Sequence, residues 1–513
     1  MVSTSAKKER TMNNNFVNAL TTITNQTTTN NGAIALKSSL SNCCDFFAQG
    51  GVLRGSSPER VWDLFSKAFC EDREVAVRLM FMFRDIRGGQ GQRQVFRDQF
   101  SQLSFQYPKE TAKLLSLIPE YGRWDDVYCA LSPLRKQVLE TIESQLKEDI
   151  VNLQDGKSIS LLGKWLKRIN TSAATSRKIG HITKRHLKLS NKEYRKLCSK
   201  LNRYLMVTEN LMSSKEWDKI EYSKVPGQCL NRNRKVFQKR DGDRYMKWVE
   251  LAQTGKVKVN AATLYPHQVI HQVRASQSWG YQDLSKTITP EEAQMFWINL
   301  ADFAVDANAI VVADLSGSMD CDHNGASPID VSIALALYFS ERAKGPYKDV
   351  FITFSREPTL QRIVGENIWD RVNSMQNDFI EDTNLEKVFD LVLQTAIASS
   401  LAAEDMVDKI YIISDMQFNA ASGQEEDRVE TFYQLMKGKF DKTIYTIPKL
   451  VFWNVNAGER NTLPVLKNTP NTCMISGFSP SILQFLGQPE LPSTEDLMMM
   501  VVNSPRYSNI KFE

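Results

Sequence analysis

The chain has 513 residues, too many for a single hydrophobic core, so two or three domains are expected. Hydrophobic residues make up 42% and charged residues 24% of the sequence, which is the balance of a globular protein and excludes a disordered chain. No apolar run reaches the ~18 residues of a membrane-spanning helix, and residues 1–10 lack the apolar core of a signal peptide, so we expect a protein of the cytoplasm or the nucleus.

The eight cysteines follow no pattern that is typical of a metal site or a disulfide framework. No Cys-x-x-Cys pair occurs and the spacing is irregular. We therefore expect reduced and mostly buried thiols.

Residues 1–33 form the first segment with a composition of its own. They are polar and repetitive, with asparagine at 13–15 and threonine at 27–29. Such a segment buries too little apolar surface to offset the chain entropy that ordering would cost. We predict a flexible polar arm.

Residues 34–300 show helical periodicity almost throughout. Pro58 directly after Ser57 is typical of a helix start, because proline is tolerated in the first turn. Further helical segments are expected at 74–83, 94–103, 109–118, 124–131, 160–168, 192–212 and 244–252. Short helices joined by short turns predict a basic helical domain of irregular, HEAT-like repeats.

In residues 301–513 short apolar runs alternate with helical segments. The expected strands lie at 309–313, 350–354, 409–413, 443–447 and 472–475, and the expected helices at 330–343, 385–399 and 427–437. This alternation predicts a doubly wound, Rossmann-like α/β domain with a mostly parallel central sheet. Ligands of such sheets bind beyond the carboxyl ends of the strands.

Polar side chains from three distant segments fall at that edge of the predicted sheet. Asp314, Ser316 and Ser318 directly follow the first strand, Thr383 precedes a helix, and Asp415 follows the third strand. Carboxylate and hydroxyl oxygens suit a hard cation, and this set leaves one coordination position open. We predict that it holds Mg²⁺ or Mn²⁺ and that the carboxylate of a protein partner completes the shell. The set resembles the metal-ion-dependent adhesion site of von Willebrand factor A (vWA) and integrin I domains, which implies a vWA domain.

Two other interpretations of this loop stay open. Aspartate and serine after a strand also act as turn or cap residues. A metal beside such side chains could instead activate water, which would make the protein a metal-dependent hydrolase. Only His323 lies nearby in sequence as a base, and with Asp320 and Asp322 it fits a solvated loop, so the hydrolase interpretation is weaker.

Positive charge is concentrated between residues 151 and 260. This segment holds 26 Lys and Arg against 9 Asp and Glu, close to +17, whereas the whole chain is +5. Basic side chains neutralise phosphates and aromatic ones stack on bases, so we predict contact with structured or single-stranded RNA. The candidate contacts are Lys164, Lys167, Arg168, Arg177, Lys178, Lys184, Arg185, Arg195, Lys196, Arg203, Arg232, Arg234 and Lys235. The alternatives are a solvated helix face, an acidic protein surface, or the acidic remainder of the same chain.

The glycine-rich string at 87–93 allows two interpretations. Its amides and guanidinium groups could contact a phosphate, or its glycines could form a turn between helices. It lacks the Lys-Ser/Thr pair that follows the glycines of a P-loop, so we favour the turn.

Several strings together resemble a two-domain family known as domain of unknown function 2828, which joins a helical half to a vWA half. They are RDIRGGQGQR at 84–93, YGRWDD at 121–126, LGKWL at 162–166, KEYRKL at 192–197, VP at 225–226, LYPH at 264–267, SDMQF at 414–418, FWN at 452–454 and SGFS at 476–479. The resemblance implies this architecture from about residue 31 onward and no settled biochemical role. Gln90 and Gln92 stand where the family pattern has Lys and Glu, which weakens a phosphate role for that loop.

The layout is also similar to that of the Ro ribonucleoprotein (TROVE) family, in which a ring of helical repeats binds small RNA and a vWA domain closes the ring. We therefore predict a non-enzymatic binding protein with a flexible arm at 1–33, a basic helical domain at 34–300 and a vWA domain at 301–513. Its expected partners are a carboxylate-bearing protein and RNA, without a membrane. A protein–protein scaffold that binds no nucleic acid is the alternative.

Overall fold

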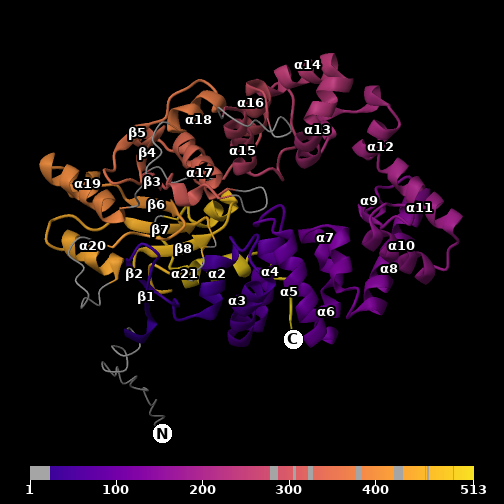
Figure 1. Cartoon of the computed structure of the whole chain (residues 1–513), viewed down its shortest axis with the longest axis horizontal. Helices are drawn as coiled ribbons and strands as arrows, with labels where there is room; N and C mark the ends of the chain where they lie inside the picture. The colour runs from indigo at the N-terminus through magenta and orange to yellow at the C-terminus, as the bar shows by residue number, and fades with distance from the viewer. Residues whose placement is uncertain are drawn as a thin grey trace, which may run out of the picture.

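The computed structural model describes residues 23–277, 287–303, 308–321, 327–376, 384–420, 431–456, 458, 462–488 and 490–512. Within these residues, the helices of the N-terminal half follow one another along a curved arc (Figure 1). The arc begins and ends against an α/β unit built from the C-terminal half (Figure 1). The predicted class, a helical domain followed by an α/β domain, is confirmed.

The helical half is built from short elements. They are α2 (Asn42–Gly50), α3 (Pro58–Glu71), α4 (Arg73–Arg84), α5 (Arg93–Gln106), α6 (Pro108–Lys113), η1 (Leu115–Leu117), α7 (Ile118–Tyr121), η2 (Trp124–Ala130), α8 (Arg135–Gln154), α9 (Leu162–Trp165), α10 (Ala174–His186), α11 (Asn191–Tyr204), α12 (Thr208–Ser213), η3 (Trp217–Lys219), η4 (Tyr222–Lys224), α13 (Gly227–Arg240), α14 (Gly242–Gln253), α15 (Pro266–Gln277) and α16 (Pro290–Ile298). Helix α3 starts as predicted, because the Ser57 side chain accepts a hydrogen bond from the Arg60 amide and Pro58 takes the first turn.

The C-terminal half contains a six-stranded sheet with the order β5-β4-β3-β6-β7-β8. Its strands are β3 (Ala309–Ala313), β4 (Val350–Thr353), β5 (Leu360–Arg362), β6 (Lys409–Ser414), β7 (Lys449–Asn454) and β8 (Thr472–Ser476). All neighbouring pairs are parallel except β4 with β5. The other elements are η5 (Gly317–Met319), α17 (Pro328–Arg342), η6 (Gly345–Tyr347), α18 (Ile368–Gln376), α19 (Leu385–Ala398), η7 (Ala403–Asp405), α20 (Phe432–Phe440), η8 (Pro480–Phe485) and α21 (Thr494–Val502).

The two faces of this sheet bury different cores. Val311 and Tyr411 belong to a core that includes α17 and extends into the helical half. Their neighbours Val312 and Ile412 belong to a second core with α19 and α20. Because successive strand residues point to opposite faces, the continuous apolar runs seen in the sequence are those of a sheet covered on both sides.

Three expectations about the elements differ from the structure. The predicted strand at 443–447 is wrong, because those residues precede the strand β7 at Lys449–Asn454. The antiparallel edge strand β5 was not expected. The predicted flexible arm ends earlier than residue 33, since β1 (Gln26–Thr28) pairs with β2 (Ile34–Leu36), while residues 1–22 lie outside the described residues.

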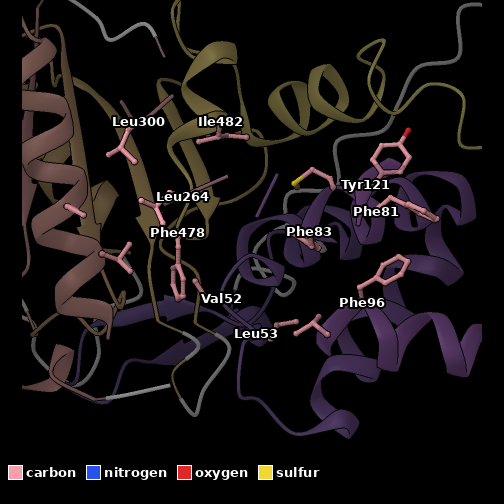
Figure 2. Packing of buried hydrophobic residues seen from close by; sticks show 14 of the residues in the cluster. Val52, Leu53, Phe81, Phe83, Phe96, Tyr121, Leu264, Leu300, Phe478 and Ile482 are labelled. Carbon is pink, nitrogen blue, oxygen red and sulfur yellow. The ribbon is translucent and has the colours of Figure 1, made fainter. Parts of the chain in front are cut away.

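The two halves pack through one continuous hydrophobic core. Figure 2 shows residues of this core from both halves, namely Val52, Leu53, Phe81, Phe83, Phe96, Tyr121, Leu264 and Leu300 with Phe478 and Ile482. Helix α2 contacts β8 and α21 at one end of the arc, and α15 contacts α17 at the other. None of the described helices is long and apolar enough to cross a bilayer.

Candidate functional site

The carboxyl ends of β3 and β6 bring together residues that are about a hundred positions apart in the sequence. The two strands are parallel neighbours, with Ala313 paired to Ile413. The Asp314 amide continues this pairing by donating to the Ile413 carbonyl at 3.0 Å. Asp314 and Asp415 therefore leave adjacent strands at the same edge of the sheet.

Hydrogen bonds connect the predicted ligands of this edge. The Ser316 amide donates to Asp314 Oδ1 at 3.0 Å. The Ser316 and Ser318 hydroxyls are 3.1 Å apart, and Ser318 Oγ donates to Asp415 Oδ2 at 3.3 Å. Four of the five predicted ligands thus lie together, while the fifth, Thr383, lies outside the described residues.

The two carboxylates of this cluster are buried beside each other. Asp314 is 0% and Asp415 6% exposed. Burial, and second the neighbouring Asp415 carboxylate, raise the pKa of Asp314 to about 7, and burial also raises the pKa of Asp415. Burial thus disfavours the ionised form of both carboxylates, and a nearby cation would favour it.

The donor set fits a hard divalent cation. It consists only of carboxylate and hydroxyl oxygens, which are the ligands that Mg²⁺ and Mn²⁺ accept. No three His, Cys, Asp or Glu side chains gather for a metal anywhere in the described residues, so a site here depends on the serine hydroxyls. Ser318 is exposed, which leaves a path from solvent to the cluster.

Sequence reasoning missed three residues that support this edge. Ser414 Oγ donates to Asp314 Oδ2 at 2.8 Å, and the Gln417 amide donates to Asp415 Oδ1 at 3.0 Å. Asn456 follows β7, and its Nδ2 atom lies 3.8 Å from the Cys321 sulfur. Ser414 could have been found from its position directly before Asp415 in a strand that pairs with β3.

Helix α15 of the helical half also reaches this edge. His271 Nδ1 and an Arg274 nitrogen contact the two oxygens of Asp330, at 2.7 and 2.6 Å. Arg274 is also 3.7 Å from Asp320, an exposed residue two positions after Ser318. The other two residues of the predicted solvated loop, 322 and 323, lie outside the described residues. These contacts of α15 could not be predicted from the sequence, because their members are more than 45 positions apart.

The glycine-rich string at 87–93 connects the two halves through hydrogen bonds. The Gln90 side-chain oxygen accepts from the amides of Phe478 and Ser479, at 2.9 and 3.0 Å. The side-chain nitrogen of Gln92 donates to the Gly50 carbonyl at 2.9 Å. The two glutamines that depart from the family pattern thus make structural hydrogen bonds, in keeping with a turn.

The predicted RNA contacts fall into two groups. Several are engaged in the fold: Lys164 pairs with Glu209, Lys167 lies 3.7 Å from Asp125, and Arg234 is only 4% exposed. The prediction that Arg234 contacts RNA is wrong, because its guanidinium is buried against Glu292 at 3.8 Å.

Five other candidates donate hydrogen bonds to uncharged groups. Lys235 bonds the Thr287 hydroxyl, Arg177 the Thr171 carbonyl, Lys184 the Asn191 side chain, Arg185 the His181 carbonyl and Arg195 the Asn191 carbonyl. Arg168 is half-buried. The remaining candidates are exposed: Lys178, Lys196, Arg203 and Arg232.

Comparison with known families agrees with this architecture. Residues 29–121 and 130–303 match the family described as Domain of unknown function (DUF2828), which covers about half of the chain. The chain belongs to this family. Residues 308–509 match a second description, Domain of unknown function (DUF7788), which covers the α/β half.

Two similar proteins can be named. An uncharacterized protein of Acanthamoeba polyphaga mimivirus is 29% identical over 495 residues, which cover 89% of this chain and 83% of that protein. The crystal structure of the Deinococcus radiodurans RO (RSR) protein aligns with 92% of this chain and 100% of its own, with a TM-score of 0.47 and 12% identity. Neither similarity assigns a function to this DUF2828 protein.

Proposed function

We propose that this DUF2828 protein is a non-enzymatic binding protein whose α/β half docks a partner carboxylate on a bound divalent cation. The observation that carries the proposal is the cluster of Asp314, Ser316, Ser318 and Asp415 at one edge of the sheet, with hydrogen bonds between successive members. A cation there would relieve the repulsion between two buried carboxylates, and Thr383 is proposed as a further ligand.

The chemistry of the set favours docking over hydrolysis. Mg²⁺ and Mn²⁺ keep coordination positions that protein side chains do not fill, and a carboxylate oxygen from another molecule suits such a position. In the described residues around the cluster, both carboxylates would be occupied by the cation, and neither is left to act as a base.

Isothermal titration of the full chain with Mg²⁺ tests this proposal. The wild type is expected to bind one ion, and Asp314→Ala to show no binding heat while retaining cooperative unfolding. Asp405→Asn is the matched control, because Asp405 is exposed and precedes β6, at the opposite end of the sheet. Equal heats for Asp314→Ala and the wild type would refute the metal assignment.

We also propose that the helical half binds RNA, and one observation favours this over contact with the acidic half of the same chain. Every ion pair described for a basic residue between 151 and 260 has its acidic partner at or before Glu292. The excess of positive charge is therefore not neutralised by described ion pairs with the α/β half. Retention of RNA by the full chain, falling steeply with salt, is the expected result, and a weak salt dependence would contradict it.

A further inference from the structure

A groove on the surface of the arc is lined mainly by basic side chains. It has a volume of ≈ 680 Å³ and runs along α11. Its lining residues are Leu153, Lys192, Arg195, Lys196, Ser199, Lys200, Arg203 and Tyr204. Five of these eight carry positive charge and none carries negative charge, so the groove is a concentrated positive surface.

The periodicity of α11 explains this concentration. Tyr194, Cys198 and Leu201 point into the core and are 0% exposed, so the basic residues between them are left on the outer face. Lys192, Lys196 and Lys200 follow at intervals of four residues, a rise of about 6 Å per step along the helix axis. A row of charges at this spacing suits consecutive phosphates of a polynucleotide chain.

None of the five basic side chains of the groove forms an ion pair with a described residue. Some other lysines of the helical half do have acidic partners, as Lys147 has Glu143 at 2.7 Å and Lys164 has Glu209 at 3.0 Å. Five neighbouring like charges without acidic partners repel one another, and an external polyanion would relieve that repulsion.

We propose that this groove binds the backbone of single-stranded RNA, with Tyr204 stacking on a base at its end. The proposal deepens the RNA part of the proposed function and rests on it. The Tyr204 hydroxyl donates to the Lys157 carbonyl at 2.7 Å, which fixes the ring, and the residue is 39% exposed. An exposed, fixed aromatic ring beside a row of cations is the combination that binds single strands without reading sequence.

The composition of the groove favours a nucleic acid over an acidic protein. Protein interfaces are depleted of lysine at their centre and need a buried apolar core. Here Leu153 and Tyr204 are the only apolar or aromatic residues of the lining, and five of the other six residues carry positive charge, which is the residue composition of nucleic-acid interfaces.

The test measures binding of the full chain to a fluorescein-labelled 12-nucleotide oligouridine by anisotropy at a series of KCl concentrations. The variant Lys192→Gln/Lys196→Gln/Lys200→Gln keeps the aliphatic stems and removes three charges. At about 0.7 released ions per phosphate contact, the slope of log K against log salt should become shallower by about 2, with at least a tenfold loss of affinity at low salt.

The matched control is Lys67→Gln/Lys136→Gln/Lys147→Gln, which removes three lysines that pair with carboxylates one helical turn away. It should bind as the wild type does. If both triple variants weaken binding equally, only net charge matters and the groove is not the site. If the α11 variant binds as the wild type does, the groove assignment is wrong while RNA binding stands. If the wild type does not bind, the RNA part of the proposed function fails.

Stacking is tested separately. Tyr204→Leu should lower affinity for the oligouridine about tenfold, whereas Tyr204→Phe should retain it. A duplex of the same length should bind more weakly than the single strand, because its bases are not free to stack on the ring. Equal binding of the duplex, or an unaffected Tyr204→Leu variant, would overturn the assignment to single strands.

Discussion

The contact between Asp85 and Arg506 provides a sharp test of how the two halves are joined. Asp85, in the helical half, is 0% exposed and receives two bonds from Arg506 near the C-terminus, at 2.8 and 2.9 Å. The Tyr507 hydroxyl donates to the same carboxylate at 3.0 Å. Replacing Arg506 by alanine would leave a buried carboxylate with the Tyr507 hydroxyl and the Arg87 amide as its partners.

The expected loss of stability follows from this geometry. Removing one partner of a fully buried ion pair costs about 3–5 kcal/mol. The Arg506 side chain is 30% exposed, so water can reach part of the vacated space, and we expect about 2–3 kcal/mol. With an unfolding entropy of about 2.1 cal/mol/K per residue, this corresponds to a decrease in Tm of about 2–3 °C for a chain of this length.

Urea unfolding followed by tryptophan fluorescence measures this difference in the free energy of unfolding. Lys511→Ala is the control, since it also removes a cation near the C-terminus, but from an exposed pair with Glu74 at 3.2 Å. The control should cost less than about 0.5 kcal/mol. A double-mutant cycle with Asp85→Asn isolates the pair, and a coupling free energy of zero would refute the reasoning.

Two further predictions concern the same junction. Burial, and second the charge of Arg54, lower the pKa of His267 to about 3, below its unfolded value of about 6.5. Between about pH 3 and pH 6.5 the unfolded chain therefore binds a proton at this histidine that the folded chain does not bind. The free energy of unfolding should fall by up to about 1.4 kcal/mol per pH unit as the pH decreases from 6.5. The variant His267→Phe should flatten this part of the dependence of the free energy of unfolding on pH, measured by urea unfolding. A Cβ on Gly51 would lie 2.3 Å from the Ser476 carbonyl oxygen, so Gly51→Ala should destabilise by about 1–3 kcal/mol, whereas Gly438→Ala, with nothing within 4 Å, should not. A Gly51→Ala variant with unchanged urea midpoint would show that the α2–β8 contact is not tight.

The sheet, and the edge of the sheet at which the candidate metal ligands lie, could both be predicted from the sequence. Val311 and Val312 lie in a run without polar interruption, and such runs occur in strands that are buried on both faces. Because parallel strands end at one edge, the positions of Asp314 and Asp415 after two such runs predicted that they meet. The structure places them next to each other, with Ser318 bonded to Asp415.

Other features could not be predicted because they depend on packing between distant segments. The run at 443–447 looks like a strand, yet the neighbouring run 449–454 pairs with both β6 and β8. The burial of Arg234 depends on Glu292, more than 50 positions away. Local propensity and charge carry no information on such partners, and tertiary context decides both.

The position of the candidate metal centre restricts how a partner can reach it. The helical half contacts the same edge of the sheet at several places, among them Gly51 at Ser476, the last residue of β8, Gln90 at the Phe478 amide, and Arg274 near Asp320 after β3. Burial would raise the pKa of Asp330, but the hydrogen bond with His271 and the charge of Arg274 outweigh it and lower that pKa, so this carboxylate is held ionised at the contact with α15. A carboxylate that docks at Ser318, as proposed, would lie close to the contact of α15 with Asp320, so we expect its protein to meet the helical half as well as the sheet. Selection of the partner is thus expected to depend on both halves of the chain.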